Sequence, residues 1–418
     1  MADDEIGWFV GIDWASESHQ VCLLDGSGEA VGERSVRHGG AGLAAACDWL
    51  AAETAAAPSS IAVAIEVPHG PVVEALLERG LQVYAINPKQ LDRFRDRFSV
   101  AGAKDDRRDA LVLADALRSD RQALRHLSID DPLVIELREW SRMTEDLQQE
   151  RNRLTNRLRE QLWRYYPQML ELGGDLAAEW ILELWHQAPT PAKAARLQRR
   201  TVERLLRAHR VRRLDAAAVL RMLRQKPLTV APGTLAAATA HIRLVADRLK
   251  LVKRQIKAAH RHLETLCDRL AACEESEPGQ AAEQRDVTIL RSMPGTGRIV
   301  IATLLAEAWQ PLGRRDYHAL RTLAGVAPVT LRSGKRCLVV RRYACNRRLA
   351  NALYHWARVA SQRDAVSRRR YAELRRRGHS HGRALRTVAD RLLAVACTLL
   401  RRQTLFDPNY TATAAAAA

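Results

Sequence analysis

Apolar and β-branched residues come in short runs near the start of the chain, separated by turn-forming residues. These runs predict five strands, at 8–13, 20–24, 30–36, 61–66 and 82–86. Stretches with helical character lie between the later strands, at 41–56 and near 71–79. A hairpin leading into βββαβαβ alternation, followed by a helix, is typical of an RNase H-like domain, which we place at residues 1–125.

Further along the chain, apolar residues recur at alternating spacings of four and three in two long segments, 133–162 and 242–273. Each seam lasts about four heptads, which predicts helices able to form a coiled coil, either with each other or across a dimer. The Arg-rich stretch between them, 175–235, favours helix but carries no motif that we can name. We therefore assign 126–284 to a helical, coiled-coil middle region.

The last third of the chain also predicts mainly helix, with a helical pattern from about 346 to 402. We assign 285–405 to a C-terminal domain and 406–418 to a disordered tail, because the final TATAAAAA offers nothing to a core. The predicted fold class is thus an α/β domain followed by two helical parts.

Charge changes this picture because it is concentrated in the C-terminal third. The chain carries a formal net charge of +18, and residues 291–418 contain 25 Lys or Arg against six Asp or Glu. Such an excess of cations predicts a polyanionic partner, with nucleic acid as the first expectation. Seven cysteines form neither a disulfide framework nor a CxxC pair, and no uncharged apolar run reaches the ~18 residues of a membrane span. We expect a soluble, cytoplasmic protein without a membrane partner.

Four acidic residues stand where an RNase H-like domain would gather them. Asp13 and Glu66 end the first and fourth predicted strands, and Asp106 and Asp109 share one face of a predicted helix. Converging carboxylates repel one another unless cations neutralise them, and hard oxygen donors select Mg²⁺ or Mn²⁺. Two such ions can clamp the attacking and leaving oxygens of a phosphoryl displacement. The sequence therefore predicts a catalytic metal site, although each acid taken alone could be a solvated surface residue.

Neighbouring residues leave alternatives open for this site. Asp105 could act together with Asp109 in place of Asp106, whereas Asp115 lies a further helical turn away. Lys104 and Arg107 flank the acids, and we assign both to nucleic-acid contacts.

A serine in the basic C-terminal third is a candidate nucleophile. Ser333 precedes Gly334 in a turn signal, and its neighbours Arg332, Lys335 and Arg336 could hold a phosphate and stabilise developing charge. By itself, Ser-Gly is also an ordinary turn.

Other basic segments of the same third predict phosphate contacts. The loop 294–298, with Gly295, Gly297 and Arg298, resembles a helix-hairpin-helix loop in which glycines let backbone amides approach a phosphate. A tight turn between helices is the alternative. Arg347, Arg348 and the Arg clusters at 368–370 and 375–377 are interpreted as phosphate contacts, with a solvated helix face as the alternative.

Taken in order, these segments resemble the insertion-sequence-110 family of transposases, DEDD enzymes that also act as bridge-RNA-guided recombinases. The resemblance covers nearly all of residues 8–362. It rests on GIDWAS, AIEVPHG and AKDDRRDA in the first part, and on PGTG, LAGVAP, RSGKR and CNRRLANAL in the last.

This resemblance implies a RuvC-like N-terminal domain, a coiled-coil middle used in dimer contacts and a C-terminal transposase domain with a catalytic serine. It implies Asp13, Glu66, Asp106 and Asp109 as metal ligands and Ser333 as the nucleophile, which would form a covalent phosphoserine and free a 3′ hydroxyl before strand exchange. The implied partners are donor and target DNA, a guide RNA and further copies of the chain as a dimer or tetramer. The implied location is the nucleoid of a prokaryotic cell.

The chain departs from the family pattern at two positions: Asp105 stands where relatives commonly have Thr or Ser, and Cys345 where they often have Gly. Two other functions remain open, namely a RuvC-like junction-resolving nuclease in which water attacks, and a non-enzymatic nucleic-acid scaffold.

Overall fold

The computed structural model describes residues 6–98, 105–128, 131–272, 280–334 and 336–408. The chain divides into two compact units, Met1–Asp131 and Pro132–Ala418, each with hydrophobic cores of its own. Lys104 and Lys335, which the sequence assigned to nucleic-acid contacts, lie outside the described residues, as does the seam residue Cys273.

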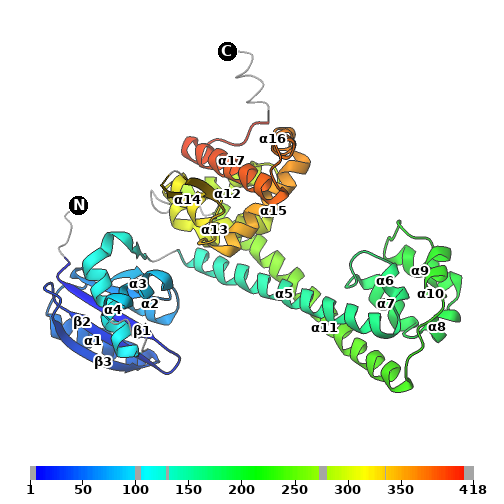
Figure 1. The fold of residues 1–418 in the computed structure, drawn as a ribbon, viewed down its shortest axis with the longest axis horizontal. Helices are drawn as coiled ribbons and strands as arrows, with labels where there is room; N and C mark the ends of the chain where they lie inside the picture. The colour runs from blue at the N-terminus through cyan, green and yellow to red at the C-terminus, as the bar shows by residue number, and fades with distance from the viewer. Residues whose placement is uncertain (1–5, 99–104, 129–130, 273–279, 335, 409–418) are drawn as a thin grey trace, which may run out of the picture. The chain divides into compact units, whose positions relative to one another are not determined.

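A six-stranded sheet forms the centre of the N-terminal unit (Figure 1). Its strands are β1 (Trp8–Trp14), β2 (Ser18–Leu24), β3 (Ala30–Arg37), β4 (Ile61–Ile65), β5 (Gln82–Ala85) and β6 (Arg125–His126), in the order β3-β2-β1-β4-β5-β6. The first three strands pair antiparallel, β4 pairs parallel with β1, and β5 pairs parallel with β4. All five predicted strands are present, and their order is consistent with an RNase H-like fold. The sequence did not indicate β6, which pairs antiparallel with β5.

Helices cover both faces of this sheet. On one face, α1 (Gly40–Thr54) and α2 (Pro71–Glu78) pack over a core that includes Ile12 and Ile65. On the other face, α3 (Pro88–Phe98) and α4 (Asp106–Asp120) pack over a core that includes Phe9 and Ala64. The short helices η1 (Pro58–Ser60) and η2 (Arg121–Ala123) precede β4 and β6. Two cores form because successive strand residues point to opposite faces.

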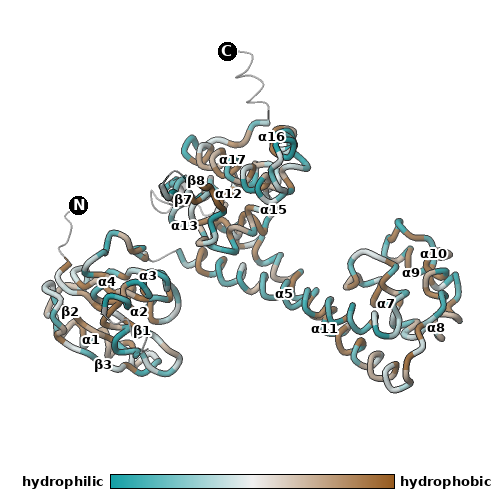
Figure 2. The backbone as a smooth tube through the Cα atoms, viewed as in Figure 1, coloured by the Kyte–Doolittle hydropathy of each residue, from teal (hydrophilic) through white to brown (hydrophobic). Residues whose placement is uncertain are grey.

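Two long helices of the second unit, α5 (Pro132–Tyr165) and α11 (Pro232–Ala272), pack against each other (Figure 1). The predicted seam of α11 is the buried face of this helix. Hydrophobic and hydrophilic residues alternate along the helix (Figure 2). Its buried seam residues are Ile242, Val245, Leu249, Val252, Ile256, Ala259, Leu263, Leu266 and Leu270. In α5, Leu137, Leu154 and Leu158 are buried in the same way. The two helices therefore pair within one chain, and a coiled coil with a second copy stays a prediction.

The Arg-rich stretch between the long helices folds around an apolar core with their ends. It forms α6 (Gln168–Glu171), α7 (Glu179–Gln187), α8 (Pro191–Ala195), α9 (Arg199–Ala208) and α10 (Ala216–Leu223). The Trp185 indole donates a hydrogen bond to the Tyr165 hydroxyl at 2.8 Å, and both side chains are fully buried. This polar contact inside the core attaches α7 to α5.

The described residues of the C-terminal part form helices and one hairpin around a separate core. Its helices are α12 (Gln280–Ser292), α13 (Arg298–Gly313), α14 (Tyr317–Leu323), α15 (Arg347–Arg363), α16 (Ala365–Arg376) and α17 (His381–Arg402), and its strands are β7 (Val329–Ser333) and β8 (Arg336–Val340). The predicted tail begins too early, because Phe406 packs against this core and its amide donates to Ser292 Oγ at 2.9 Å. Across the described residues, no helix has the length and apolarity that crossing a bilayer requires.

Candidate functional site

Asp13 and Glu66 lie at neighbouring positions on one face of the sheet. β1 and β4 are parallel with Ile12 opposite Ile65, so the next residue of each chain segment lies at the shared carboxyl end. Ile12 and Ile65 point into the core below α1 and α2, and strand alternation therefore directs Asp13 and Glu66 to the face that α4 covers. Both side chains are half-buried. The sheet thus brings together the two strand-end acids that the sequence predicted.

Helix α4 approaches β1 so closely that only glycine fits between them. A Cβ on Gly11 would lie 1.9 Å from the Ala110 carbonyl oxygen and 2.6 Å from the Ala114 amide nitrogen. At the other end of α4, the Arg118 guanidinium covers Gly28, which follows β2 at the end of the sheet where β1 begins. Helix α4 therefore runs against the direction of β1, and its first turn lies at the same sheet end as Asp13.

The two acids of α4 have different surroundings although they are three residues apart. Asp106 is the first residue of the helix and is exposed, whereas Asp109 is 2% exposed. Arg95 of α3 holds Asp109 in a bidentate ion pair, with Nε 2.7 Å from Oδ1 and Nη2 2.8 Å from Oδ2. Burial alone would lower the pKa of Arg95, but the contacts with Asp109 and Asp92 outweigh burial and raise it. The sequence did not single out Arg95.

The four acids offer the type of ligand atom that divalent cations bind. Carboxylate oxygens are the ligands that Mg²⁺ and Mn²⁺ prefer. The four predicted ligands lie at the same end of the sheet, two at the ends of strands and two on the first turn of α4. Over the part of the chain that the structure describes, no three His, Cys, Asp or Glu side chains lie close enough to hold an ion as they stand. In this structure the guanidinium of Arg95 supplies the positive charge at Asp109.

Asp105 and Asp115 have structural partners. Asp105 is the N-cap of α4, and its side chain accepts a hydrogen bond from the Arg107 amide at 3.1 Å. Asp115 pairs with Arg118 at 2.9 Å on the same helix. The guanidinium of Arg107, which the sequence assigned to nucleic acid, forms an ion pair with Glu33 of β3. An N-cap role accounts for an acid at position 105, because a carboxylate caps a helix as well as the hydroxyl of Thr or Ser does.

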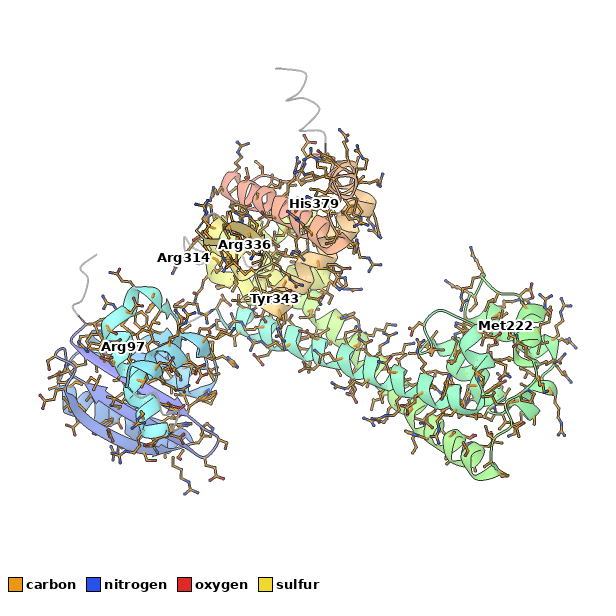
Figure 3. All side chains as sticks on the ribbon, viewed as in Figure 1. Arg97, Met222, Arg314, Arg336, Tyr343 and His379 are labelled. Carbon is orange, nitrogen blue, oxygen red and sulfur yellow. The ribbon has the colours of Figure 1, made fainter. Side chains whose placement is uncertain are left out.

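Ser333 lies at the tip of an exposed hairpin. Strands β7 and β8 pair antiparallel with Ser333 opposite Arg336, and Gly334 has a φ of 55°, as two-residue hairpin turns require. Ser333, Arg332 and Arg336 are all exposed, and Figure 3 shows Arg336 on this part of the chain. The predicted turn is present, and the strands on either side of it are a feature that the sequence analysis missed. Alternating residues around a Ser-Gly signal could have revealed them.

The two glycines of the loop 294–298 have different roles. A Cβ on Gly295, which has a φ of 82°, would lie 2.7 Å from the backbone nitrogen of Ala360 in α15. Gly297 is the N-cap of α13 and has open space around it. The Trp356 indole, from α15, donates to the Pro294 carbonyl at 2.9 Å. Close packing of α15 therefore explains Gly295, whereas Gly297 is open to a ligand and the next residue, Arg298, pairs with Glu264 at 2.7 Å.

The remaining basic candidates divide into paired and unpaired residues. Arg348 lies 3.2 Å from Glu145 of α5, whereas Arg347 is exposed. In the Arg clusters 368–370 and 375–377, Glu373 of α16 pairs with Arg370 and Arg377. Two of the clustered arginines therefore already have a carboxylate partner in this structure.

Glu307 and Asn346 form a half-buried polar contact that the sequence analysis did not anticipate. Asn346 caps α15 through the Leu349 amide at 3.0 Å, and its Nδ2 donates to Glu307 Oε2 at 2.7 Å. Arg142 of α5 lies 3.4 Å from the same carboxylate. The preceding Cys345 packs its sulfur against Gly325. These contacts fix the segment that leads from the hairpin into α15.

Comparison with known proteins gives the class of protein that carries these residues. Residues 10–167 match a family model described as "Transposase", and residues 287–372 match one described as "Transposase IS116/IS110/IS902 family". The first match contains the four acids and the second contains Ser333. Both units therefore carry transposase sequence.

Relatives extend this similarity over almost the whole chain. The mini-circle putative transposase for IS117 of Streptomyces coelicolor is 33% identical over 416 residues, which cover 97% of each chain. The insertion element IS116 uncharacterized 44.8 kDa protein of Streptomyces clavuligerus is 28% identical over 96% of each chain. The putative transposase y4uE of Sinorhizobium fredii is 62% identical over 214 residues, 51% of this chain and 60% of that relative. The chain belongs to the IS116/IS110/IS902 family of transposases, the family that its motifs resemble.

Proposed function

We propose that this transposase cleaves and exchanges strands of insertion-element DNA through a serine nucleophile and a metal-binding acid set. The observation that carries the proposal is the position of Asp13 and Glu66 on one face at the end of parallel strands, with the first turn of α4 at the same end. Phosphoryl transfer on DNA requires positive charge beside the anionic phosphate. A divalent cation held by a set of acids would supply this charge.

The proposed metal ligands are Asp13, Glu66, Asp106 and Asp109. A divalent cation bound there would supply positive charge to the phosphoryl oxygens during displacement. Because Arg95 engages both oxygens of Asp109, Asp109 joins this set only after its ion pair with Arg95 opens. Arg95 is thus the partner of the Asp109 carboxylate when no metal is bound.

In the proposed reaction, the Ser333 hydroxyl oxygen attacks a DNA phosphorus. The hydroxyl loses its proton as a bond forms between Oγ and phosphorus, the bond to the 3′ oxygen breaks, and the departing 3′ oxygen takes up a proton in its place. Attack by a 3′ hydroxyl of another strand on the phosphoserine then releases the serine and joins the new strands. One ester replaces another at each step, so no external energy source is needed. Arg332 and Arg336 on the same hairpin supply cations near the phosphate.

Guidance by a bridge RNA and assembly as a dimer or tetramer are proposed from the family resemblance. Recombination between donor and target plasmids, measured with and without the RNA transcribed beside the gene, tests guidance. Light scattering of the purified protein tests assembly. Product formation that is the same without RNA would contradict guidance.

Recombination of donor and target DNA in Mg²⁺ tests the chemistry. We expect Ser333→Ala and Asp13→Asn to abolish joined products and Thr330→Val, which removes another hydroxyl from β7, to keep them. Full recombination by Ser333→Ala would contradict the serine mechanism. Cleaved but unjoined ends from both wild type and Ser333→Ala would instead favour a hydrolytic, RuvC-like nuclease.

A further inference from the structure

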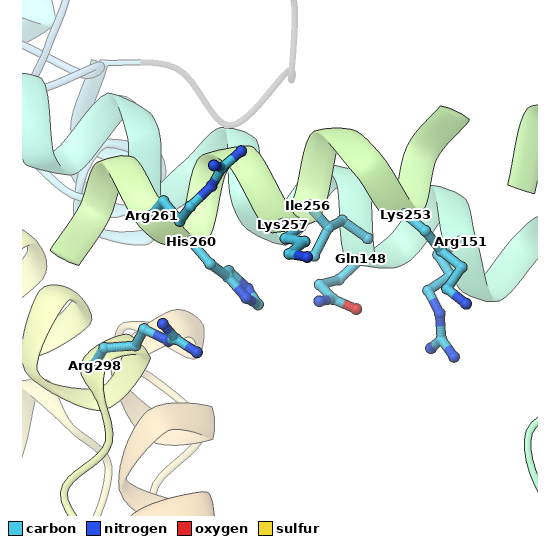
Figure 4. A pocket seen from close by; sticks show the side chains of 8 residues that line it. All are labelled: Gln148, Arg151, Lys253, Ile256, Lys257, His260, Arg261 and Arg298. Atoms are coloured by element: carbon cyan, nitrogen blue, oxygen red, sulfur yellow. The ribbon is translucent and has the colours of Figure 1, made fainter. Parts of the chain in front are cut away.

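A cationic hollow of about 350 Å³ lies along the pair of long helices in the second unit (Figure 4). Its wall comes from α5, α11 and the start of α13. Six of its eight lining residues are basic: Arg151, Lys253, Lys257, His260, Arg261 and Arg298. The other two are a glutamine and an isoleucine, so no carboxylate lines the hollow.

Ion pairs neutralise only part of this charge. Arg151 pairs with Asp175, Lys253 lies 3.9 Å from Glu179, and Arg298 lies 2.7 Å from Glu264. Lys257 and Arg261 are exposed, and neither has a carboxylate partner within the described part of the chain. Cations held together in a concave surface repel one another, and an anion that enters relieves this repulsion.

The spacing of the cations suits an extended anion. Lys253, Lys257 and Arg261 follow one another at intervals of four residues on α11, which places successive side chains about 6 Å apart along one face. They form a strip about 12 Å long, too long for one isolated phosphate group. No Phe, Tyr or Trp side chain lines the hollow, so stacking of bases on these large rings is not part of its chemistry.

The start of α13 completes the wall. Arg298 is the first residue of that helix, and Gly297 before it has nothing within 4 Å of where a Cβ would lie. Free backbone amides at a helix start favour anions. Burial lowers the pKa of His260 and nearby Arg298 lowers it further, so at neutral pH His260 contributes a neutral hydrogen-bonding ring.

We propose that this hollow binds a run of phosphates in a nucleic-acid backbone, without reading its sequence. The proposal concerns binding alone and does not depend on Ser333 or on the metal ligands. It requires only that the protein handle nucleic acid, as a transposase does with DNA. DNA and RNA present the same phosphodiester chemistry, and the experiment separates them.

The test uses the full-length double variant Lys257→Gln/Arg261→Gln, which removes two unpaired, exposed cations. The control is Arg200→Gln/Arg204→Gln, which removes the same charge at the same spacing from exposed positions of α9. Binding of each protein to labelled duplex DNA, single-stranded DNA and a duplex RNA is measured over a series of salt concentrations. Circular dichroism checks that both variants fold.

For the hollow variant we expect binding weaker by on the order of tenfold, and a slope of log K against log salt that is smaller by about 2. The control should change neither by a comparable amount. A change confined to DNA probes assigns the hollow to DNA, one confined to the RNA probe assigns it to RNA, and a change on both assigns it to the shared backbone. Unchanged slopes on every probe, or an equal change in the control, would overturn the proposal.

Discussion

Arg95 Nε lies 2.7 Å from Asp109 Oδ1 and Arg95 Nη2 lies 2.8 Å from Asp109 Oδ2, so a guanidinium holds both oxygens of an expected metal ligand. The Asp109 side chain is 4% exposed and the Arg95 side chain 30%. Four carboxylates at one sheet end need a compensating charge, and in this structure Arg95 supplies part of it.

Arg95→Gln should destabilise the metal-free N-terminal unit by about 3 kcal/mol, because it leaves Asp109 buried without its partner. Hydrogen exchange of the α4 amides measures this unit separately from the rest of the chain. The matched control is Arg79→Gln, whose pair with Asp48 has side chains 47% and 67% exposed and should cost less than about 1 kcal/mol. Added Mn²⁺ should protect α4 more in Arg95→Gln than in wild type. Equal losses in the two variants would contradict the role of the buried pair.

Gly11→Ala should displace α4 from β1 and lower stability by about 1–3 kcal/mol or more, since the new methyl group would overlap the Ala110 carbonyl. It should also reduce recombination strongly, because the first turn of α4 carries Asp106 and Asp109. Gly7→Ala is the control, as nothing lies within 4 Å of the added group. Thermal unfolding and recombination are measured for both proteins. A Gly11→Ala protein indistinguishable from Gly7→Ala would show that the helix has room to move.

We predict that the protein loses stability in mild acid because of His19. This residue is 1% exposed with Nε2 3.0 Å from His38 Nδ1, and burial first and His38 second lower its pKa. In the unfolded chain His19 has an ordinary pKa of about 6.5, whereas in the folded protein its pKa is lower. As the pH falls below about 6.5, the unfolded chain therefore gains a proton that the folded protein does not, and the free energy of unfolding decreases until the pH passes the folded-state pKa of His19. His19→Gln should therefore lose less melting temperature between about pH 7 and about pH 5 than wild type does. The exposed His355→Gln should keep the wild-type slope, and an unchanged slope in His19→Gln would reject His19 as the cause.

Local sequence was sufficient for the N-terminal sheet because each strand carries its own signal. Short apolar runs mark β1 and β2, and a turn signal separates β2 from β3. The same pattern placed Asp13 and Glu66 at strand ends, and the register of β1 with β4 made them neighbours. The strand β6 has only two residues, too few for any periodicity.

Tertiary packing created the features that the sequence did not reveal. Arg95 is one of several charged residues in α3, and only the packing of α3 beside α4 selects it for Asp109. The cationic hollow combines side chains from three helices that are distant in sequence. Gly295 suggested an approach to phosphate, but the neighbour that requires a glycine is the backbone of α15. In each case the informative partner lies beyond the reach of a local pattern.

The central claim is that Ser333 becomes covalently joined to DNA. The direct measurement incubates full-length protein, with the RNA transcribed beside its gene, on labelled donor DNA in Mg²⁺, followed by denaturing electrophoresis. The account predicts a labelled band at the size of protein plus DNA that disappears in Ser333→Ala and Asp13→Asn but persists in Thr330→Val. Mass spectrometry should then find the nucleotide adduct on the peptide that contains Ser333. Cleaved DNA without any linked protein, or a linked band that persists in Ser333→Ala, would contradict the serine mechanism.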